Sequence, residues 1–259
     1  MPDVSKMKKP DVKVVLLGDM NVGKTSLLHR YMDRKFKETI STIGGAFFLK
    51  QWGPYNISIW DTAGREQFHG LGSMYCRGAA AVILTYDVTN WQSLAELEER
   101  FLSLTDTALQ DCIYALVGNK ADLTDQQAQL AQDPDGQPQD QTESRDRTDT
   151  LLSACPTPPD SPASLSGVHK QVTREDAVAL YGRILHYKGL DEKSSLPADK
   201  MCFETSAKTG FNVDAMFETL FDLVLPSILR KRNENQRSPT VDLEEYREVG
   251  SKRSRSGCC

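Results

Sequence analysis

The chain has 259 residues, of which 26% are charged and 39% hydrophobic, and its formal net charge is −5. This length allows one large domain or two small ones, and no apolar run approaches the roughly 18–20 residues of a membrane span. The negative charge is concentrated between residues 124 and 168, which leaves the rest close to neutral and gives no indication of nucleic-acid binding. Six irregularly placed cysteines indicate neither a disulfide framework nor a zinc site, and residues 1–10 form a polar lead without a secretory signal, so a reducing cytosolic compartment is expected.

The first predicted strand leads into a glycine-rich motif. The apolar run Val12–Leu17 is followed by Gly18-Asp19-Met20-Asn21-Val22-Gly23-Lys24-Thr25, which reads G-x-x-x-x-G-K-[ST], and residues 26–32 have helical spacing. A strand, a glycine loop and a helix N-terminus together form an anion site, in which Lys24 would reach the β- and γ-phosphates and the Thr25 hydroxyl would bind Mg²⁺. Taken alone, the motif could also be a chance match in an ordinary strand–turn–helix.

A hairpin is predicted next. After a polar loop over residues 33–45, residues 46–52 and 55–61 read as two strands around Gly53-Pro54, and the second strand ends in Asp61-Thr62-Ala63-Gly64. An acid at the carboxyl end of a strand beside a phosphate-loop strand is typical of the aspartate that serves Mg²⁺. Such a motif on its own is more often a simple turn.

Strands and helices then alternate. Residues 79–86 read as a strand buried on both faces, residues 91–104 as a helix, and residues 113–117 as another buried strand, which ends in Gly118-Asn119-Lys120-Ala121-Asp122. This alternation predicts a doubly wound α/β sheet with its ligands at the carboxyl ends of the strands.

The stretch from Thr124 to about Val168 breaks this regularity. It contains seven glutamines and half of the twelve prolines, and it shows no periodicity. Such a stretch buries too little apolar surface to offset the entropy of ordering, so a disordered insertion is expected. Residues 151–152 and 157–162 could form a docking or phosphorylation site, but a solvated loop is favoured.

The predicted order resumes at Thr173, which caps a helix with an acidic first turn. Residues 201–205 read as a short last strand followed by Ser206-Ala207-Lys208. Asn212 then caps a final helix, which Pro226 is expected to bend. From Asn233 onward the chain is polar, so residues 233–259 are predicted to be a flexible tail.

Four motifs, GDMNVGKT, DTAG, NKAD and SAK, stand in this order. Together they resemble the Ras-superfamily GTP-binding domain, and the segments 41–44, 60–64 and 77–79 with the pair Cys258-Cys259 resemble the Rab family. The similarity covers residues 11–123 and 169–232, so the domain is expected over residues 11–232. It implies an α/β P-loop NTPase G domain with a mostly parallel, doubly wound six-stranded sheet, about five flanking helices, and GTP or GDP with Mg²⁺.

The chemistry of guanine agrees with the third motif. The Asp122 carboxylate offers two acceptors to the N1–H and N2–H₂ donors of the base, although a turn carboxylate is the simpler alternative. By resemblance, Asn119 braces the loop, Ser206 supports Asp122, the N–H of Ala207 reads O6, and Phe36 lies edge-on to the ring or only staples its loop. The nucleotide-binding set is Asp19, Asn21, Val22, Gly23, Lys24, Thr25, Ser26, Phe36, Thr42, Gly64, Asn119, Lys120, Asp122, Ser206, Ala207 and Lys208.

The same resemblance implies a switch. The metal ligands would be Thr25, Thr42 and Asp61, and the residues that act in hydrolysis would be Lys24, Thr42, Gly64 and Arg65. Thr42 and Gly64 would contact Mg²⁺ and phosphate only with GTP bound, which orders the loops at about 34–46 and 62–77.

Three departures from the family pattern concern hydrolysis and partner binding. Arg65 stands where glutamine is usual, and arginine only donates hydrogen bonds, so slow intrinsic hydrolysis is expected. Met20 stands where small residues are favoured and could crowd an activator's arginine, and Gly44–Phe47 departs from the usual effector-contact pattern. Activators of the TBC class supply a glutamine as well as an arginine, so stimulated hydrolysis remains possible.

The pair Cys258-Cys259 does not match C-a-a-X, and it resembles the double-geranylgeranyl acceptor of Rab proteins; an unmodified polar tail is the alternative. The resemblance implies a monomer on the cytoplasmic face of Golgi, endosomal or phagosomal membranes, with a cytosolic pool. The implied partners are an exchange factor, a TBC-type activating protein, a GDP-dissociation inhibitor, an escort protein with geranylgeranyl transferase, and effectors.

Two other functions stay open. In the first, the chain is a largely non-hydrolysing, GTP-held scaffold. The second, an ATP-using P-loop enzyme, is disfavoured by Asp122.

Overall fold

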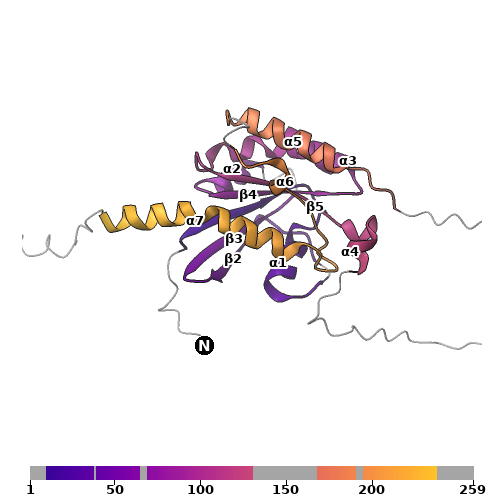
Figure 1. The fold of residues 1–259 in the computed structure, drawn as a ribbon, viewed down its shortest axis with the longest axis horizontal. Helices are drawn as coiled ribbons and strands as arrows, with labels where there is room; N and C mark the ends of the chain where they lie inside the picture. Colours follow the sequence, from indigo (N-terminus) through magenta and orange to yellow (C-terminus); the bar gives the residue numbers. More distant parts are fainter. Residues whose placement is uncertain (1–9, 38, 65–68, 131–167, 191–194, 238–259) are drawn as a thin grey trace, which may run out of the picture.

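The computed structural model describes residues 10–37, 39–64, 69–130, 168–190 and 195–237. Its centre is a six-stranded sheet in the order β2-β3-β1-β4-β5-β6 (Figure 1). All neighbouring strands are parallel except β2, which pairs antiparallel with β3. The strands are β1 Val12–Leu17, β2 Gly45–Trp52, β3 Tyr55–Thr62, β4 Ala81–Asp87, β5 Ile113–Asn119 and β6 Cys202–Glu204.

Helices cover both faces of the sheet (Figure 1). One face carries α1 (Lys24–Asp33) and α7 (Val213–Arg237), and the other carries α2 (His69–Cys76), α3 (Trp91–Glu96) and α5 (Arg174–Tyr187). Two further helices are short, α4 (Gln126–Leu130) and α6 (Ala198–Met201). The α/β fold with a mostly parallel six-stranded sheet is therefore confirmed.

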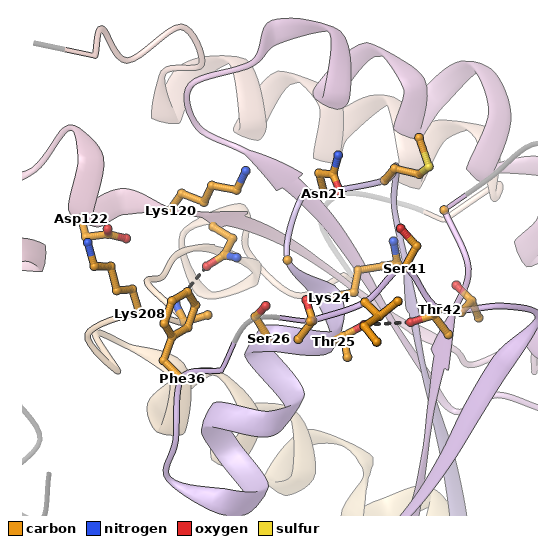
Figure 2. Close-up of a pocket in the computed structure, with 18 of the residues that line it drawn as sticks. Asn21, Lys24, Thr25, Ser26, Phe36, Ser41, Thr42, Lys120, Asp122 and Lys208 are labelled. Atoms are coloured by element: carbon orange, nitrogen blue, oxygen red, sulfur yellow. Dashed lines mark hydrogen bonds between the residues drawn. The ribbon is translucent and has the colours of Figure 1, made fainter. Parts of the chain in front are cut away.

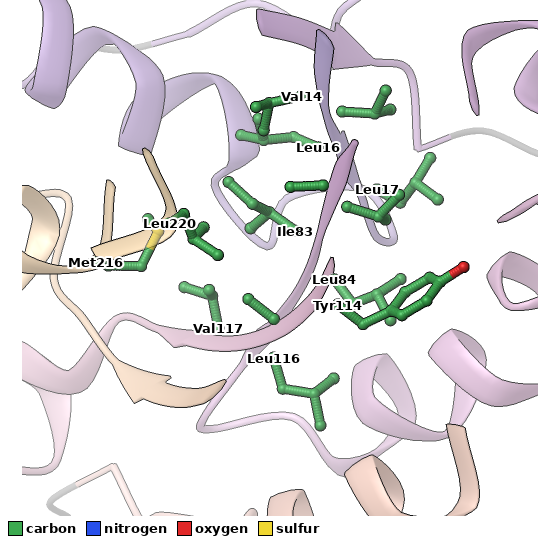
Figure 3. Close-up of a cluster of buried hydrophobic side chains, with 14 of the residues drawn as sticks. Val14, Leu16, Leu17, Ile83, Leu84, Tyr114, Leu116, Val117, Met216 and Leu220 are labelled. Carbon is green, nitrogen blue, oxygen red and sulfur yellow. The ribbon is translucent and has the colours of Figure 1, made fainter. Parts of the chain in front are cut away.

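The central strands are buried because helices lie on both of their faces. All seven residues of β4 are buried, and five of the six in β1 are. Figure 3 shows aliphatic side chains of β1, β4 and β5 packed with Met216 and Leu220 of α7. On the α1 side, the ring of Tyr31 stacks on Phe217 with centroids 4.3 Å apart, which ties the helix after the glycine loop to α7.

The cap predicted at Thr173 before α5 is present, and the structure shows it as a reciprocal capping box with Asp176. The Thr173 hydroxyl accepts a hydrogen bond from the Asp176 N–H at 3.2 Å, and the Asp176 carboxylate accepts one from the Thr173 N–H at 2.9 Å. Two of the backbone donors at the start of the helix, the N–H groups of Thr173 and Asp176, are thus satisfied by side chains close in the sequence.

The structure corrects several predicted boundaries. The single helix expected over residues 91–104 is α3 followed by a π-helical turn at Leu97–Phe101 and a 3₁₀ turn at Ser103–Thr107. The irregular insertion was expected from residue 124, but α4 is ordered there because Ala128 is buried and its carbonyl accepts from Thr209 at 2.7 Å. The last helix was expected to stop before residue 233 and instead runs to Arg237.

Several predictions concern residues that the structure does not describe. These are most of the N-terminal lead, the remainder of the insertion over residues 131–167, Arg65, and the tail from residue 238 with Cys258 and Cys259. Among the described residues, no helix is both long enough and apolar enough to cross a bilayer.

Candidate functional site

A cleft of about 320 Å³ opens where the strands end. Its walls come from the loops after β1, β3 and β5, the loop after β6, and the segment between α1 and β2. Figure 2 shows Phe36, Asp122 and Lys208 at one end of the cleft and Thr25 and Thr42 at the other. The four motifs, which are far apart in the sequence, therefore meet at one site, as predicted.

The glycine loop has a backbone that only glycine accommodates at two points. Gly18 and Gly23 have φ angles of 144° and 95°. A Cβ atom at Gly18 would lie 2.2 Å from the Thr85 carbonyl oxygen, and one at Gly23 would lie 2.3 Å from the Asn119 side-chain nitrogen. The loop is thus pressed against β4 and the NKAD motif, which fixes the start of α1.

Lys24, the first residue of α1, is 5% exposed. Its ammonium group donates to the carbonyl oxygens of Gly18 and Asp19, both at 2.8 Å, so it is held inside the loop. Burial lowers the pKa of Lys24 to about 8, although the negative charges of Asp61 and Asp19 oppose the shift. A phosphate at this loop would provide the anion that such a buried cation lacks.

Three oxygen-bearing side chains converge beside Lys24. The Thr25 hydroxyl donates to Asp61 Oδ2 at 2.6 Å, and the Thr42 hydroxyl lies 3.2 Å from the same oxygen and 3.0 Å from the Thr25 hydroxyl. Burial raises the pKa of Asp61, and the hydrogen bond from Thr25 and the charge of Lys24 counteract that rise.

This oxygen cluster fits Mg²⁺. Asp61 is fully buried, and its second carboxylate oxygen, Oδ1, has no hydrogen-bond partner among the described residues. An orphaned carboxylate oxygen next to two hydroxyls is the kind of donor set that a small, hard cation prefers. The cluster unites the three predicted metal ligands, which lie at the start of α1, in the loop before β2 and near the end of β3.

The opposite end of the cleft is braced by NKAD and SAK. The Ser206 hydroxyl donates to Asp122 Oδ1 at 2.6 Å, and this hydrogen bond fixes the orientation of the Asp122 carboxylate. The Asn119 amide donates to the Val22 carbonyl at 2.8 Å and so ties the base end to the glycine loop. These two supports agree with the roles predicted for Ser206 and Asn119.

Ala207 has a partner that was not predicted. Its N–H, expected to face the base, donates to Asn119 Oδ1 at 3.1 Å. To donate to guanine O6, the Ala207 N–H would have to leave Asn119 Oδ1 or be shared between the two acceptors. Lys120 also has an unpredicted partner, since its ammonium group lies 2.6 Å from Asp87 Oδ2.

The two loops expected to switch are in contact. The N–H of Ala63 donates to the Gly44 carbonyl at 2.9 Å. Gly64 lies so close to the glycine loop that a Cβ atom there would be 2.4 Å from the Met20 nitrogen. The loop after β3 thus begins packed directly on the phosphate loop.

Most of the predicted nucleotide and metal residues that the structure describes line the cleft, and four of the described ones do not: Asp19, Val22, Asp61 and Ser206. These four act from behind its walls through the contacts given above. Four lining residues outside the predicted set directly adjoin predicted ones, which was the available signal: Met20, Ser41, Thr62 and Leu123. Two more, Thr39 and Ile40, lie in the loop between the predicted Phe36 and Thr42.

A glycine loop with a buried lysine, an oxygen cluster for Mg²⁺ and a braced Asp122 define a P-loop nucleotide-binding protein. The chain matches the Ras family over residues 13–145 and belongs to that family of small GTPases. It is 60% identical over 253 residues to the Ras-related protein Rab-20 of Homo sapiens and 58% identical to that of Mus musculus, with 98% of this chain and all of each relative covered. It is also 44% identical over 128 residues to the Ras-related protein Rab5 of Nicotiana tabacum, which covers 48% of this chain and 64% of that relative. These relatives identify the chain as a Rab-type small GTPase of vesicle traffic.

Proposed function

We propose that this protein is a membrane-anchored GTP/GDP switch in vesicle traffic that hydrolyses GTP slowly to GDP and phosphate. The observation that carries the proposal is the position of Thr42, whose hydroxyl lies 3.0 Å from that of Thr25 and 3.2 Å from Asp61. A residue from the loop before β2 thus reaches the phosphate end of the cleft, where it can sense whether a γ-phosphate and its metal are present.

Each end of the cleft would bind one part of the nucleotide. Lys24 would move its donors from the carbonyls of Gly18 and Asp19 to phosphate oxygens, and the N–H groups of the glycine loop would complete the cradle. Asp122, oriented by Ser206, would accept from the guanine N1–H and N2–H₂ groups. Thr25, Thr42 and Asp61 would hold Mg²⁺, which when bound supplies positive charge that stabilises the phosphates.

Hydrolysis is proposed to be slow because of Arg65. A glutamine at this position can accept a hydrogen bond from the attacking water and donate one to the phosphate, whereas arginine only donates. The related GTPases that lack a supplied arginine turn over at only roughly 10⁻⁴–10⁻³ s⁻¹ unaided. We therefore expect an off-signal that depends on an activating protein of the TBC type, which would bring its own glutamine and arginine.

Membrane anchoring is proposed through geranylgeranyl groups on Cys258 and Cys259. Two lipid chains give stable anchoring where one is marginal, and Lys252, Arg253 and Arg255 would add attraction to an anionic leaflet. The proposed partners are an exchange factor, a GDP-dissociation inhibitor, an escort protein with its transferase, and effectors that read the loops at 34–46 and 62–77. The proposed compartments are Golgi, endosomal or phagosomal membranes.

The test is single-turnover hydrolysis of Mg²⁺–GTP by the full chain, alone and with a panel of TBC-domain activators. We expect slow loss of GTP alone, acceleration by at least one activator, and an intrinsic rate raised about tenfold in Arg65→Gln. Arg65→Ala is the matched control, because it removes the arginine without adding an acceptor and should stay slow. Equal intrinsic and activated rates in wild type and Arg65→Gln would contradict the role given to this side chain.

A second candidate, a GTP-held scaffold for effectors, is favoured by the same Arg65. It predicts no loss of GTP with any activator, so that the signal would end by extraction or exchange. Failure of the purified chain to retain a guanine nucleotide would reject both functions, and displacement of GTP by an equal concentration of ATP would favour an ATP-using enzyme.

A further inference from the structure

Arg30 is a buried cation outside the cleft. It lies in the last turn of α1, it is 8% exposed, and it is absent from the residues that line the cleft. A guanidinium group removed from water must have its donors satisfied, so its partners show which parts of the molecule it holds in place.

Those partners are backbone carbonyls of two loops. Arg30 Nε donates to the Ala207 carbonyl at 2.8 Å, and Nη2 donates to the carbonyl of Lys208. Nη1 donates to the carbonyl of Arg34 at 3.4 Å, at the left-handed residue that ends α1. One planar fork therefore joins the SAK loop, some 180 residues away in the sequence, to the exit of the phosphate-loop helix.

The SAK loop is also held from its other side. The Ala207 N–H donates to Asn119, and the Ser206 hydroxyl donates to Asp122. Ala207 is thus hydrogen-bonded through its N–H to Asn119 of the NKAD motif and through its carbonyl to Arg30, so the two peptide groups that flank it are fixed in orientation. Without Arg30, the carbonyls of residues 207 and 208 would lose a charged donor, and the side of the loop that faces α1 would lose this support.

We propose that Arg30 is a positioning residue for guanine recognition: it holds the SAK loop, and through Ser206 the Asp122 carboxylate, in register with the phosphate loop. This inference rests on the proposed guanine-nucleotide function. It adds a contact behind the cleft that sets nucleotide residence time and base preference, and it couples the two ends of the site through a single side chain of α1.

The test measures dissociation of a fluorescent GDP analogue from the full chain with Mg²⁺ present, for wild type, Arg30→Met and Arg30→Lys. Arg30→Met should raise the dissociation rate at least about tenfold, the change expected when charge-assisted hydrogen bonds are lost. Arg30→Lys keeps the charge but lacks the planar fork that reaches the carbonyls of both loops at once, so it should restore part of the residence time. Arg183→Met is the matched control, since it removes an arginine that is 52% exposed and pairs with Glu98 at 2.9 Å, and it should leave the rate unchanged.

A second readout separates positioning from a general loss of stability. Inosine diphosphate lacks the 2-amino group that Asp122 would bind, so its dissociation rate relative to GDP reports how well Asp122 is placed. The preference for GDP should fall in Arg30→Met and, by the same route, in Ser206→Ala. A faster Arg30→Met with an unchanged preference would overturn the proposal, as would an unchanged dissociation rate. If wild type itself fails to retain GDP, the proposed function fails first, so the two failures are distinguishable.

Discussion

At the scale of single residues, the site contains two buried charges, Lys24 and Asp61, that form no salt bridge within the described part of the chain. Lys24 is enclosed by two carbonyl oxygens, and burial moves its pKa from an ordinary value near 10.5 to about 8. Asp61 is buried with one carboxylate oxygen unpartnered among the described residues, and burial raises its pKa. A bound phosphate would stabilise the charged form of Lys24, and a bound cation would stabilise the charged form of Asp61.

The shifted lysine makes nucleotide binding depend on pH. Near pH 8.5 a large part of the free protein has neutral Lys24, and a bound phosphate favours the ammonium form, so binding must take up a proton. At about pH 6.5 Lys24 is already charged in the free protein, so nucleotide binding takes up no proton at this residue. The affinity for the nucleotide should therefore fall as the pH rises through 8. Calorimetry of GDP binding to nucleotide-depleted protein, in two buffers of different ionisation enthalpy, measures this uptake.

The control for that experiment is Lys24→Arg, which stays charged at both pH values and should remove the uptake that belongs to Lys24. Identical proton uptake in wild type and Lys24→Arg near pH 8.5 would show that another group titrates instead.

At the scale of helices and turns, the features that could be predicted are those whose interacting residues lie close together in the sequence. The cap at Thr173 was predicted because a cap and the first turn of its helix are close in the sequence, and the structure extends that cap to a capping box with Asp176. By contrast, α2 was not predicted, since Gly70 and Gly72 give it poor helix propensity and its position comes from packing on the turn at residues 103–107. The π turn after α3 likewise has no clear local signal in Leu97–Phe101.

The capping box has a measurable effect on stability. Thr173→Ala removes the acceptor for the Asp176 N–H and should lower the free energy of unfolding by about 1 kcal/mol. Thr173→Ser keeps the hydroxyl and should unfold like wild type. Urea unfolding at one fixed concentration of GDP and Mg²⁺ measures the difference, because bound nucleotide itself contributes to stability. Equal midpoints for the alanine and serine variants would indicate that the cap is not formed in solution.

At the scale of the whole molecule, the motifs could be predicted to meet because parallel strands end at one edge of the sheet. Their residue types are set by phosphate, metal and base chemistry, so Lys24, Thr25, Asp61 and Asp122 were identifiable without coordinates. What could not be predicted is which distant groups hold them. The bond from Arg30 to Ala207, like the use of the Ala207 N–H by Asn119, depends on the orientation of α1 and the SAK loop across the sheet.

The last whole-molecule property is the proposed attachment to membranes, for which the candidate residues lie beyond the described part of the chain. The proposed attachment depends on lipid chains at Cys258 and Cys259. Each buried CH₂ contributes about 0.8 kcal/mol, so one chain binds reversibly and two bind stably. In cells, wild type should therefore sediment with membranes, the single variants Cys258→Ser and Cys259→Ser should divide between membrane and soluble fractions, and the double variant should be soluble. Because the G domain is untouched, all four proteins should retain GDP equally, which separates anchoring from folding. A double variant that still sediments with membranes in a flotation gradient would refute lipid anchoring and leave protein partners as the basis of attachment.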